Sequence, residues 1–328
     1  MKLTIKVKNF YSYLRNKYKP KKSLNSLRLR YINYHRKNPF SFKDDKYFIA
    51  FYFQKKMGYP INLRNPKTIN EKLNWMKLFD RNPIYPQFSD KWSCRSYVSQ
   101  KIGSRFLKPI IGVYETVEEV PWQKLPEKFV IKASHGSGWN IICDDRNLFN
   151  QPEAEEKLKA WLAQNFYQKF REWQYKSTKP RILVEPYLEG DPVYGLVEYQ
   201  FYCFNGNPEL IQVDIDCNRA HSRLFLSPDW KEMPFTIVRY PIFQAHFPKP
   251  SNLEEALYCV SELTKGLPFC RVDLHIIENN ILVSEMTLMP GAGYMKFNPP
   301  KYDLYLGDLL KCKPNVSSLL SSWRGHDH

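Results

Sequence analysis

The sequence has no long hydrophobic segment. Its longest apolar stretches, such as residues 47–53, are far shorter than the roughly 20 residues of a membrane-spanning helix. Residues 1–10 alternate lysine with apolar side chains and lack both the continuous apolar core and the small-residue cleavage site of a secretion signal. We therefore expect a cytoplasmic protein without a membrane-spanning helix.

Cysteine and glycine are also scarce. The 7 cysteines are odd in number and never stand in C-x-x-C spacing, which indicates neither a disulfide framework nor a structural zinc site. The 13 glycines and the absence of repeats argue against a fibrous or disordered chain. With 43% hydrophobic residues in 328, the composition is typical of a globular protein of enzyme size or of two to three sub-domains.

Positive charge is concentrated near the amino-terminal end. Residues 1–46 hold 14 lysines and arginines against two aspartates, so twelve of the sixteen net positive charges lie there. Four apolar or aromatic residues within this stretch have helical spacing: Leu24, Leu27, Tyr31 and Tyr34. Arginines at positions 28, 30 and 36 surround them, so we expect a basic amphipathic helix.

Three uses of this helix remain open. It could lie on an anionic membrane surface, where each basic residue contributes about 1 kcal/mol of attraction. It could instead attract an acidic polymer or nucleic acid. The third possibility is that it packs on the rest of the protein and leaves its basic face in water.

Helices are indicated at several places in the remaining chain. Thr68-x-x-Glu71 has the capping-box pattern, and the apolar spacing after it predicts a helix over 68–79. Asp90 is expected to begin another helix. Two more helices are expected, one with Leu158, Leu162 and Phe166 on one face and one capped by Ser251 and Glu254 and bearing Leu253, Leu257, Val260 and Thr264.

Strands are expected in pairs. The runs 128–134 and 139–144 flank the turn His135-Gly136-Ser137-Gly138, which predicts a hairpin with a glycine loop. Further strands are expected at 181–188, 198–204 and 210–216, and a second hairpin at 271–277 and 281–287. Paired strands favour an α+β fold with antiparallel sheets over a regular βαβαβ series.

The glycine loop is the first candidate site. Its small residues allow backbone amides to approach a phosphate, and Lys132 can place an ammonium group on the same anion. The loop matches neither a Walker loop nor a dinucleotide fingerprint. An ordinary hairpin turn explains the pattern equally well.

The second hairpin is the other candidate site. Asp273 and Glu285 are expected to meet across its strands, with Arg271 beside the first and Thr287 beside the second. Paired carboxylates suit Mg²⁺, which takes one or two carboxylates together with phosphate oxygens. The alternative is a solvated sheet surface above an apolar face formed by Val272, Leu274, Ile276 and Met286.

Four segments resemble a known family. They are Phe129-Val-Ile-Lys-Ala-Ser-His-Gly-Ser-Gly-Trp-Asn-Ile-Ile-Cys143, Glu198-Tyr-Gln-Phe-Tyr-Cys-Phe-Asn-Gly206, Arg271-Val-Asp-Leu274 and Glu285-Met-Thr-Leu-Met-Pro-Gly-Ala-Gly293. In order and spacing they resemble the TupA-like branch of the ATP-grasp superfamily, over about Phe48 to Leu310. The resemblance implies an α+β ATP-grasp fold, with two antiparallel-sheet lobes and flanking helices around a nucleotide cleft.

The same resemblance implies a division of the chain into four parts. These are a basic amphipathic extension (1–46), an N-terminal helical or α+β domain (47–126), the small lobe (127–190) and the large lobe with the metal and the substrate (191–328).

It also implies roles for individual residues. Lys91 and Lys132 would contact the phosphates, Lys132 and Arg271 would act on the transferred phosphate, and Thr287 stands where many ATP-grasp enzymes carry a metal-binding Asn. Glu185 resembles the acidic residue that holds the adenine, and Gln200 stands where this branch commonly has lysine. The implied nucleotide ligands are Lys91, Lys132, His135, Gly136, Ser137, Gly138, Glu185 and Leu188, and the implied metal ligands are Asp273, Glu285 and Thr287.

The activity implied is that of an ATP- and Mg²⁺-dependent carboxylate–amine ligase. A carboxylate is a poor electrophile, so the γ-phosphate of ATP is first transferred to it and an amine then displaces phosphate from the acyl phosphate. The implied substrates are an amino acid or peptide and a uronic acid of a bacterial surface polysaccharide or its lipid-linked precursor. Arg219, His221 and Arg223 are candidates for binding a substrate carboxylate.

Two other functions remain possible. The same cleft could serve a kinase or glycosyltransferase of polysaccharide biosynthesis, or the chain could be a non-catalytic binder of acidic polymer. No nucleic-acid partner is expected for the enzyme.

Overall fold

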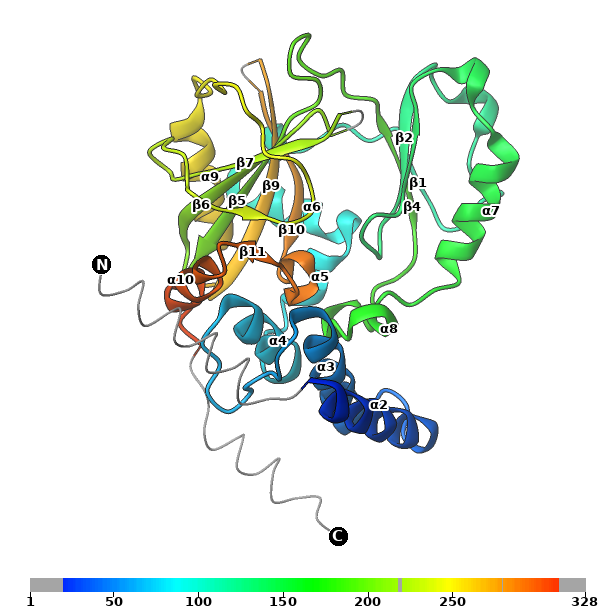
Figure 1. Cartoon of the computed structure of the whole chain (residues 1–328). Coiled ribbons are helices and arrows are strands. Elements are labelled where there is room, and N and C mark those ends of the chain that lie inside the picture. Colours follow the sequence, from blue (N-terminus) through cyan, green and yellow to red (C-terminus); the bar gives the residue numbers. More distant parts are fainter. Residues whose placement is uncertain (1–19, 218–219, 279, 313–328) are drawn as a thin grey trace.

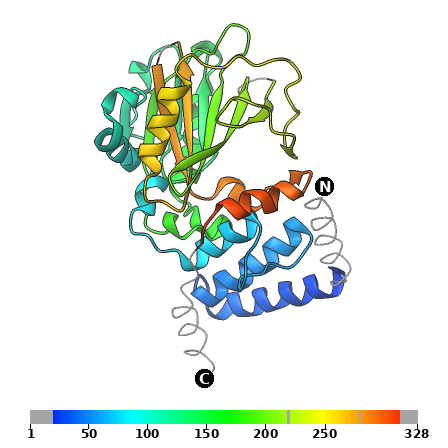
Figure 2. The same ribbon diagram turned by 90° about the vertical axis from the view of Figure 1, so that its left-hand side faces the viewer.

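The computed structural model describes residues 20–217, 220–278 and 280–312 (Figure 1). Two antiparallel sheets form two lobes, and a group of helices lies below them (Figures 1 and 2). The predicted combination of helices and antiparallel sheets is therefore confirmed. Among the described helices, none is long and apolar enough to span a bilayer.

The smaller lobe is a four-stranded sheet in the order β1-β4-β2-β3. Helix α7 (Gln151–Leu162) covers one face and buries Leu158 against Phe129 and Ile131 (Figure 1). The strand β1 comes from the range 47–126, so this sheet reaches further back along the chain than 127. Its strands are β1 (Gly112–Tyr114), β2 (Phe129–Ala133), β3 (Asn140–Cys143) and β4 (Ile182–Pro186).

The helix predicted through Phe166 is shorter than expected. α7 ends at Leu162, and the Asn165 side chain then accepts a hydrogen bond from the Tyr167 amide, which starts the separate short helix α8 (Tyr167–Phe170). Phe166 consequently packs with Tyr167 and Tyr175 in a different cluster.

The larger lobe is a five-stranded sheet in the order β10-β9-β5-β6-β7. Helix α9 (Leu253–Thr264) covers one face and belongs to the main core with Val272 and Leu274. The five strands are β5 (Glu198–Phe204), β6 (Asn207–Ile215), β7 (Ser222–Leu226), β9 (Phe269–Ile277) and β10 (Asn280–Thr287). A separate pair of short strands is formed by β8 (Thr236–Ile237) and β11 (Phe297–Asn298).

Both predicted hairpins are present in the structure. The helices begin where the sequence predicts, with one exception. Thr68 and Glu71 make the full capping box, and the Asp90 side chain accepts from the Trp92 amide. The cap predicted at Ser251 is wrong, because α9 begins at Leu253 and its N-cap residue, Asn252, makes no side-chain cap bond.

The helices below the lobes come from both ends of the described chain. Figure 2 shows α10 lying across the amino-terminal helices, and Asp303 of α10 accepts hydrogen bonds from the backbone and side-chain nitrogens of Asn70 at 3.1 and 2.9 Å. These helices are α2 (Pro20–Lys37), α3 (Phe42–Met57), α4 (Ile69–Phe79), α5 (Tyr85–Ser89) and α10 (Lys301–Leu309), whereas α6 (Lys91–Ile102) packs against α9 and β10 of the larger lobe. Short 3-10 turns are η1 (Ser104–Phe106), η2 (Trp122–Lys124), η3 (Arg146–Leu148), η4 (Trp173–Tyr175) and η5 (Pro290–Gly293).

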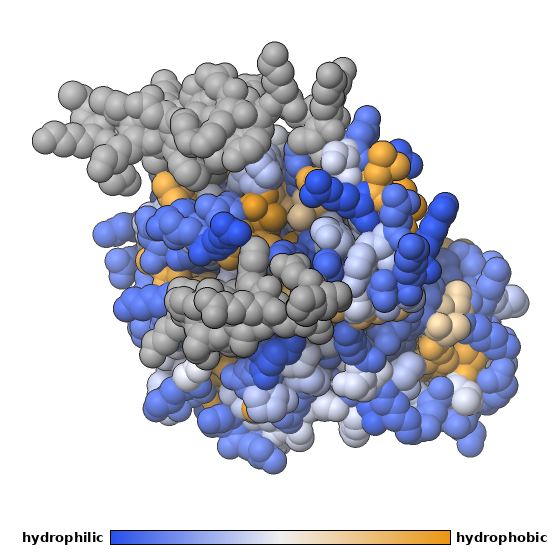
Figure 3. All heavy atoms as spheres, turned by 90° about the horizontal axis from the view of Figure 1, so that it is seen from below, coloured by the Kyte–Doolittle hydropathy of each residue, from blue (hydrophilic) through white to orange (hydrophobic). Residues whose placement is uncertain are grey.

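The basic helix predicted near the amino terminus is α2, and its apolar stripe packs on α3. The Tyr31 ring lies 5.5 Å from that of Phe48 and 6.2 Å from that of Phe51. Seen from below, the coloured surface is mostly hydrophilic, with hydrophobic residues in separate patches (Figure 3). The packed stripe favours the third use of the helix, and binding to a membrane or an acidic polymer stays a prediction. Residues 1–19 lie outside the described part of the chain.

Candidate functional site

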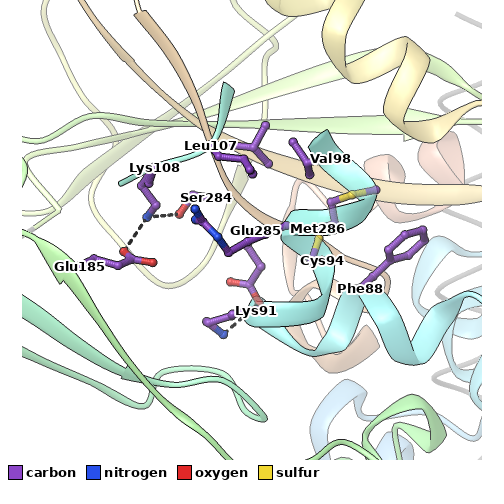
Figure 4. A pocket seen from close by; sticks show the side chains of 12 residues that line it. Phe88, Lys91, Cys94, Val98, Leu107, Lys108, Glu185, Ser284, Glu285 and Met286 are labelled. Atoms are coloured by element: carbon purple, nitrogen blue, oxygen red, sulfur yellow. Dashed lines mark hydrogen bonds and ion pairs between the residues drawn. The ribbon is translucent and has the colours of Figure 1, made fainter. Parts of the chain in front are cut away.

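Two lysines and a glutamate form an ionic cluster in the small lobe. Lys132 on β2 and Glu185 on β4 are joined by a 2.7 Å contact, because the antiparallel register sets Glu185 beside Val130, diagonal to Lys132. Lys108 lies 3.2 Å from the same carboxylate (Figure 4). Burial alone would raise the pKa of Glu185, but the two ammonium groups lower it to about 2.

Lys108 has no counterpart among the residues expected from the sequence. It follows Leu107, which forms a parallel bridge to Val283, and its ammonium lies 3.3 Å from the Ser284 hydroxyl of β10. Burial, together with the neighbouring Lys132, lowers the pKa of Lys108 to about 8. This lysine therefore links the two lobes, and no local sequence pattern indicates it.

The two lobes together enclose a cavity of about 220 Å³. Small-lobe residues at its wall include Lys132, Glu185 and Leu188, and large-lobe residues include Glu198 and His275. Burial and the nearby Lys108 lower the pKa of His275 to about 4, so this imidazole is neutral at physiological pH. The lysine expected to contact phosphate thus faces the large lobe across a cleft.

The acidic hairpin brings its four polar side chains together. Glu285 pairs directly with Asp273, and Thr287 with Arg271. The Arg271 guanidinium grips Asp273 through two hydrogen bonds, at 2.7 and 2.6 Å, and lies 3.4 Å from the Thr287 hydroxyl. The predicted geometry of this face is therefore present.

A β-bulge creates the pairing of the two carboxylates. Near the turn, Ile277 pairs with Asn280 and Leu274 with Val283. Continued without interruption, that register would set Ser284 opposite Asp273 and turn Glu285 to the other face of the sheet. The register shifts by one residue between Val283 and Glu285, so Glu285 comes opposite Asp273.

These two carboxylates fit Mg²⁺ better than a metal held by protein ligands alone. Within residues 20–217, 220–278 and 280–312, no group of three His, Cys, Asp or Glu side chains could hold a metal ion. Mg²⁺ needs only one or two carboxylates when phosphate oxygens and water complete its coordination. Asp273 and Glu285 would hold it, and Thr287 is close enough to Arg271 to act as that residue's partner instead.

Lys91 connects the glycine loop with the acidic hairpin. Its ammonium donates to the Gly136 carbonyl at 2.6 Å and lies 3.7 Å from Glu285 (Figure 4). In the loop, Ser137 and Gly138 are exposed, and Gly138 has a φ of +74° that favours glycine. His135 is buried, with its Nε2 3.0 Å from the Trp161 carbonyl oxygen, which suits orienting the loop.

The predicted carboxylate-binding group lies at the other edge of the large sheet. Arg223 is buried and grips Asp214 of the same protein, and His221 lies 3.3 Å from that carboxylate. Arg219 is outside the described residues. Gln200 stands opposite Asp273 on the neighbouring strand and donates to Glu198 at 2.7 Å. A lysine at this position would add a positive charge beside Asp273. Gln200 instead continues the row of polar side chains formed by Glu285 and Asp273 onto the next strand.

The chain is similar to one family of known sequences and to several solved structures. The family model described as TupA-like ATPgrasp matches residues 71–311. No curated protein matches. The solved structures that match include D-alanine–D-alanine ligase from Bacillus anthracis, at 18% identity and a TM-score of 0.38, over 67% of this chain and 63% of that one.

Two other solved structures are similar at the same level. D-alanine–D-alanine ligase from Helicobacter pylori has 14% identity and a TM-score of 0.39, over 74% of this chain and 69% of that one. Phosphoribosylamine–glycine ligase from Thermotoga maritima has 14% identity and a TM-score of 0.38, over 67% and 55%. The chain thus spans less than two thirds of the length of the Bacillus and Thermotoga proteins. Because the family model matches most of the sequence, the chain belongs to the TupA-like ATP-grasp family.

Proposed function

We propose that the chain is a carboxylate–amine ligase that uses ATP and Mg²⁺ and works through an acyl phosphate. One observation carries the proposal. The Lys132–Glu185–Lys108 cluster and the Asp273–Glu285 pair come from different lobes, yet Lys108 and Lys91 tie them to one cleft. A cationic cluster opposite a pair of carboxylates suits a magnesium-bound triphosphate.

The residues of this cleft have distinct tasks in such a reaction. A substrate carboxylate oxygen attacks the γ-phosphorus of ATP, the bond to the bridging oxygen breaks, and ADP leaves. Lys132 and Arg271 are placed to spread the negative charge on the transferring phosphoryl group. Mg²⁺, when bound to Asp273 and Glu285, would neutralise the same charge.

The second step forms the amide. A neutral amine attacks the carbonyl carbon, phosphate departs with the electrons of the C–O bond, and the nitrogen releases a proton. The glycine loop, held by Lys91 through the Gly136 carbonyl, is placed to exclude water that would otherwise hydrolyse the acyl phosphate.

For the substrates, we propose an amino acid or peptide as the amine and a uronic acid of a bacterial surface polysaccharide as the carboxylate. The family membership supports this choice, and so does the net charge of +16, which suits an acidic glycan. Gln200 in place of a lysine leaves the acceptor region less cationic than is usual for the branch.

A screen of amino acids against uronic acid sugars, read by mass spectrometry and phosphate release, tests the proposal. A ligase should release ADP and phosphate in equal amounts only when an acid and an amine are both present, and the product should carry a new amide. ADP release with a phosphorylated sugar and no amide would instead identify a kinase. Turnover that depends on a nucleotide sugar would identify a glycosyltransferase.

We also propose that the basic face of α2 brings the enzyme to anionic membranes. Because its apolar stripe is packed on α3, the attraction should be electrostatic and should disappear at about 0.5 M salt. In flotation assays, the full chain should bind vesicles of phosphatidylglycerol and phosphatidylcholine but not phosphatidylcholine alone.

The exposed arginines of α2 provide the matched test. Binding should fall when Arg28, Arg30 and Arg36 are changed to alanine. It should persist when three exposed lysines elsewhere are changed in the same way: Lys124, Lys157 and Lys265. Equal flotation with both vesicle types would reject the membrane role.

A further inference from the structure

A groove of about 820 Å³ lies beside the cleft and has no role in the reaction described above. One wall is formed by α6 and the residues just before it, and the other by the stretch 177–181 that leads into β4. Its lining combines apolar surface with hydroxyl, amide and charged groups, among them the Asp90 carboxylate. The main lining residues are Gln87, Trp92, Arg95, Ser99, Ser177 and Arg181.

Several groups in this groove are available to a ligand. Arg95 is half-buried, and within the described part of the chain its guanidinium has no ion-pair or hydrogen-bond partner, whereas Arg181 pairs with Asp90 at 3.0 Å. The Ser99 and Ser177 hydroxyls likewise have no partner among the described residues. Trp92 is 40% exposed, so the indole presents a broad apolar surface to the groove. The groove thus combines one free cation, free hydroxyls and an aromatic platform.

Arg95 also connects the groove with the cleft. It stands one helical turn after Lys91, so both side chains lie on the same face of α6. Arg95 and Leu107 line the groove and also a small cavity with Lys91, Lys108 and Glu285 in its wall (Figure 4 shows that cavity). A ligand held by Arg95 would therefore end next to the proposed phosphoryl-transfer centre.

The chemistry of the lining indicates what would bind. A planar guanidinium can grip a carboxylate through two parallel hydrogen bonds. Hydroxyl groups suit the many hydroxyls of a sugar, and an exposed indole suits the apolar face of a sugar ring. The volume exceeds that of the cavity between the lobes, at about 220 Å³, so it suits several linked sugar rings better than a single amino acid.

We propose that this groove is the acceptor subsite of the enzyme and that it binds a chain of sugar acids, with Arg95 holding a uronate carboxylate and Trp92 stacking on a sugar ring. The inference rests on the proposed ligase function and names the place where its acid substrate lies. Arg223, which the sequence offered for this task, lies on β7 at the opposite edge of the large sheet from β10.

Binding of a galacturonate tetramer, measured by calorimetry without ATP, tests this assignment. The full chain should bind the tetramer, and Arg95→Ala should weaken binding about tenfold or more, because a charged hydrogen-bond pair is lost. Arg95→Lys should restore part of the affinity, since lysine keeps the charge but not the fork geometry. Trp92→Ala should weaken binding as well. Circular dichroism shows whether each variant is folded.

Two matched controls accompany these variants. Lys101→Ala removes an exposed cation from the same helix outside the groove and should leave tetramer binding unchanged. The methyl-esterified tetramer, which has the same sugar rings but no charge, should bind the full chain about as weakly as the acid binds Arg95→Ala.

Other outcomes would overturn the assignment. These are a full chain that binds no tetramer, equal affinity for the acid and its ester, or unchanged affinity in Arg95→Ala. If Arg95→Ala instead lost only the binding of L-glutamate or L-alanine, the occupant would be the amine substrate. Tetramer binding without amide formation would contradict the ligase proposal alone, and amide formation that ignores Arg95 would contradict the groove alone.

Discussion

Replacing Glu285 by glutamine or Asp273 by asparagine should reduce Mg²⁺-dependent ATP turnover by about 100-fold or more. Each change removes one of the two carboxylates that the bulged hairpin sets opposite each other. A neutral amide binds Mg²⁺ weakly, so the charge that develops on the transferring phosphoryl group would lose its main counterion. Turnover is measured as ADP release against Mg²⁺ concentration.

The two variants differ in what else they disturb. Asp273 is buried and holds Arg271, so its replacement leaves a partly buried guanidinium without its carboxylate and should also destabilise the fold. Glu285 is more exposed, with Lys91 at 3.7 Å, and gives the cleaner result. Glu278→Gln, at the exposed tip of the same hairpin, is the control and should behave like the unchanged chain. Near-normal turnover in Glu285→Gln, with the Mg²⁺ requirement unchanged, would refute the metal assignment.

Glu185→Gln should destabilise the protein by about 3 kcal/mol near neutral pH, because it leaves two ammonium groups facing each other in a largely buried site. The resemblance implies that Glu185 holds adenine, whereas its contacts here are with Lys132 and Lys108. We therefore expect the variant to weaken binding of ATP and GTP equally. Selective loss of ATP would support the adenine role instead.

The pH dependence of this destabilisation follows from the pKa values. The pKa of Glu185 is lowered to about 2, so its stabilising effect is present above the ordinary value near 4.5 and is lost as the pH falls toward 2. The pKa of Lys108 is lowered to about 8, so folding gains stability as the pH rises from about 8 toward 10.5. In Glu185→Gln this gain should begin at lower pH, because the Glu185 carboxylate no longer raises the pKa of Lys108. The difference in the free energy of unfolding between the unchanged protein and the variant should therefore be largest between about pH 5 and 8.

Urea unfolding of both proteins at pH 3, 6.5 and 9.5 would measure these differences. Glu189→Gln is the matched control, because Glu189 pairs with Lys128 in an exposed lysine–glutamate contact of 2.6 Å. Exposed pairs contribute about 0 to 1 kcal/mol. If Glu185→Gln were as stable at pH 6.5 as the control variant, the Glu185 carboxylate would not stabilise the two lysines, and the prediction would be wrong.

The local elements of the site could be predicted because their signals are short in sequence. The capping box of Thr68 and Glu71 and the strands around the glycine loop depend on neighbours a few residues apart. The same is true of the strands that carry Asp273 and Glu285. The predicted end of α7 was wrong by four residues and the predicted cap at Ser251 by one, because the apolar pattern does not fix where a helix begins or ends.

Other parts of the site could not be predicted from patterns. Lys108 acquires its role only because the neighbouring Leu107 forms a β-bridge with Val283, which lies 176 positions further along the chain. No sequence motif indicates this contact. Arg95 is one of many arginines in a basic sequence until the fold shows that it is left without a partner beside the cleft. The packing of α2 on α3 likewise depends on aromatic contacts between two helices.

The sequence by itself determined the two hairpins, the family and the identity of the acidic pair, because alternation along a strand and the spacing of motifs are local properties. Only the tertiary structure decided that Glu285 lies beside both Asp273 and Lys91. An uninterrupted register would have turned Glu285 away from Asp273, and the single extra residue of the bulge at Ser284 reverses this. The physical reason is that a strand's side chains alternate with a period of two, so one inserted residue changes which face every later residue occupies.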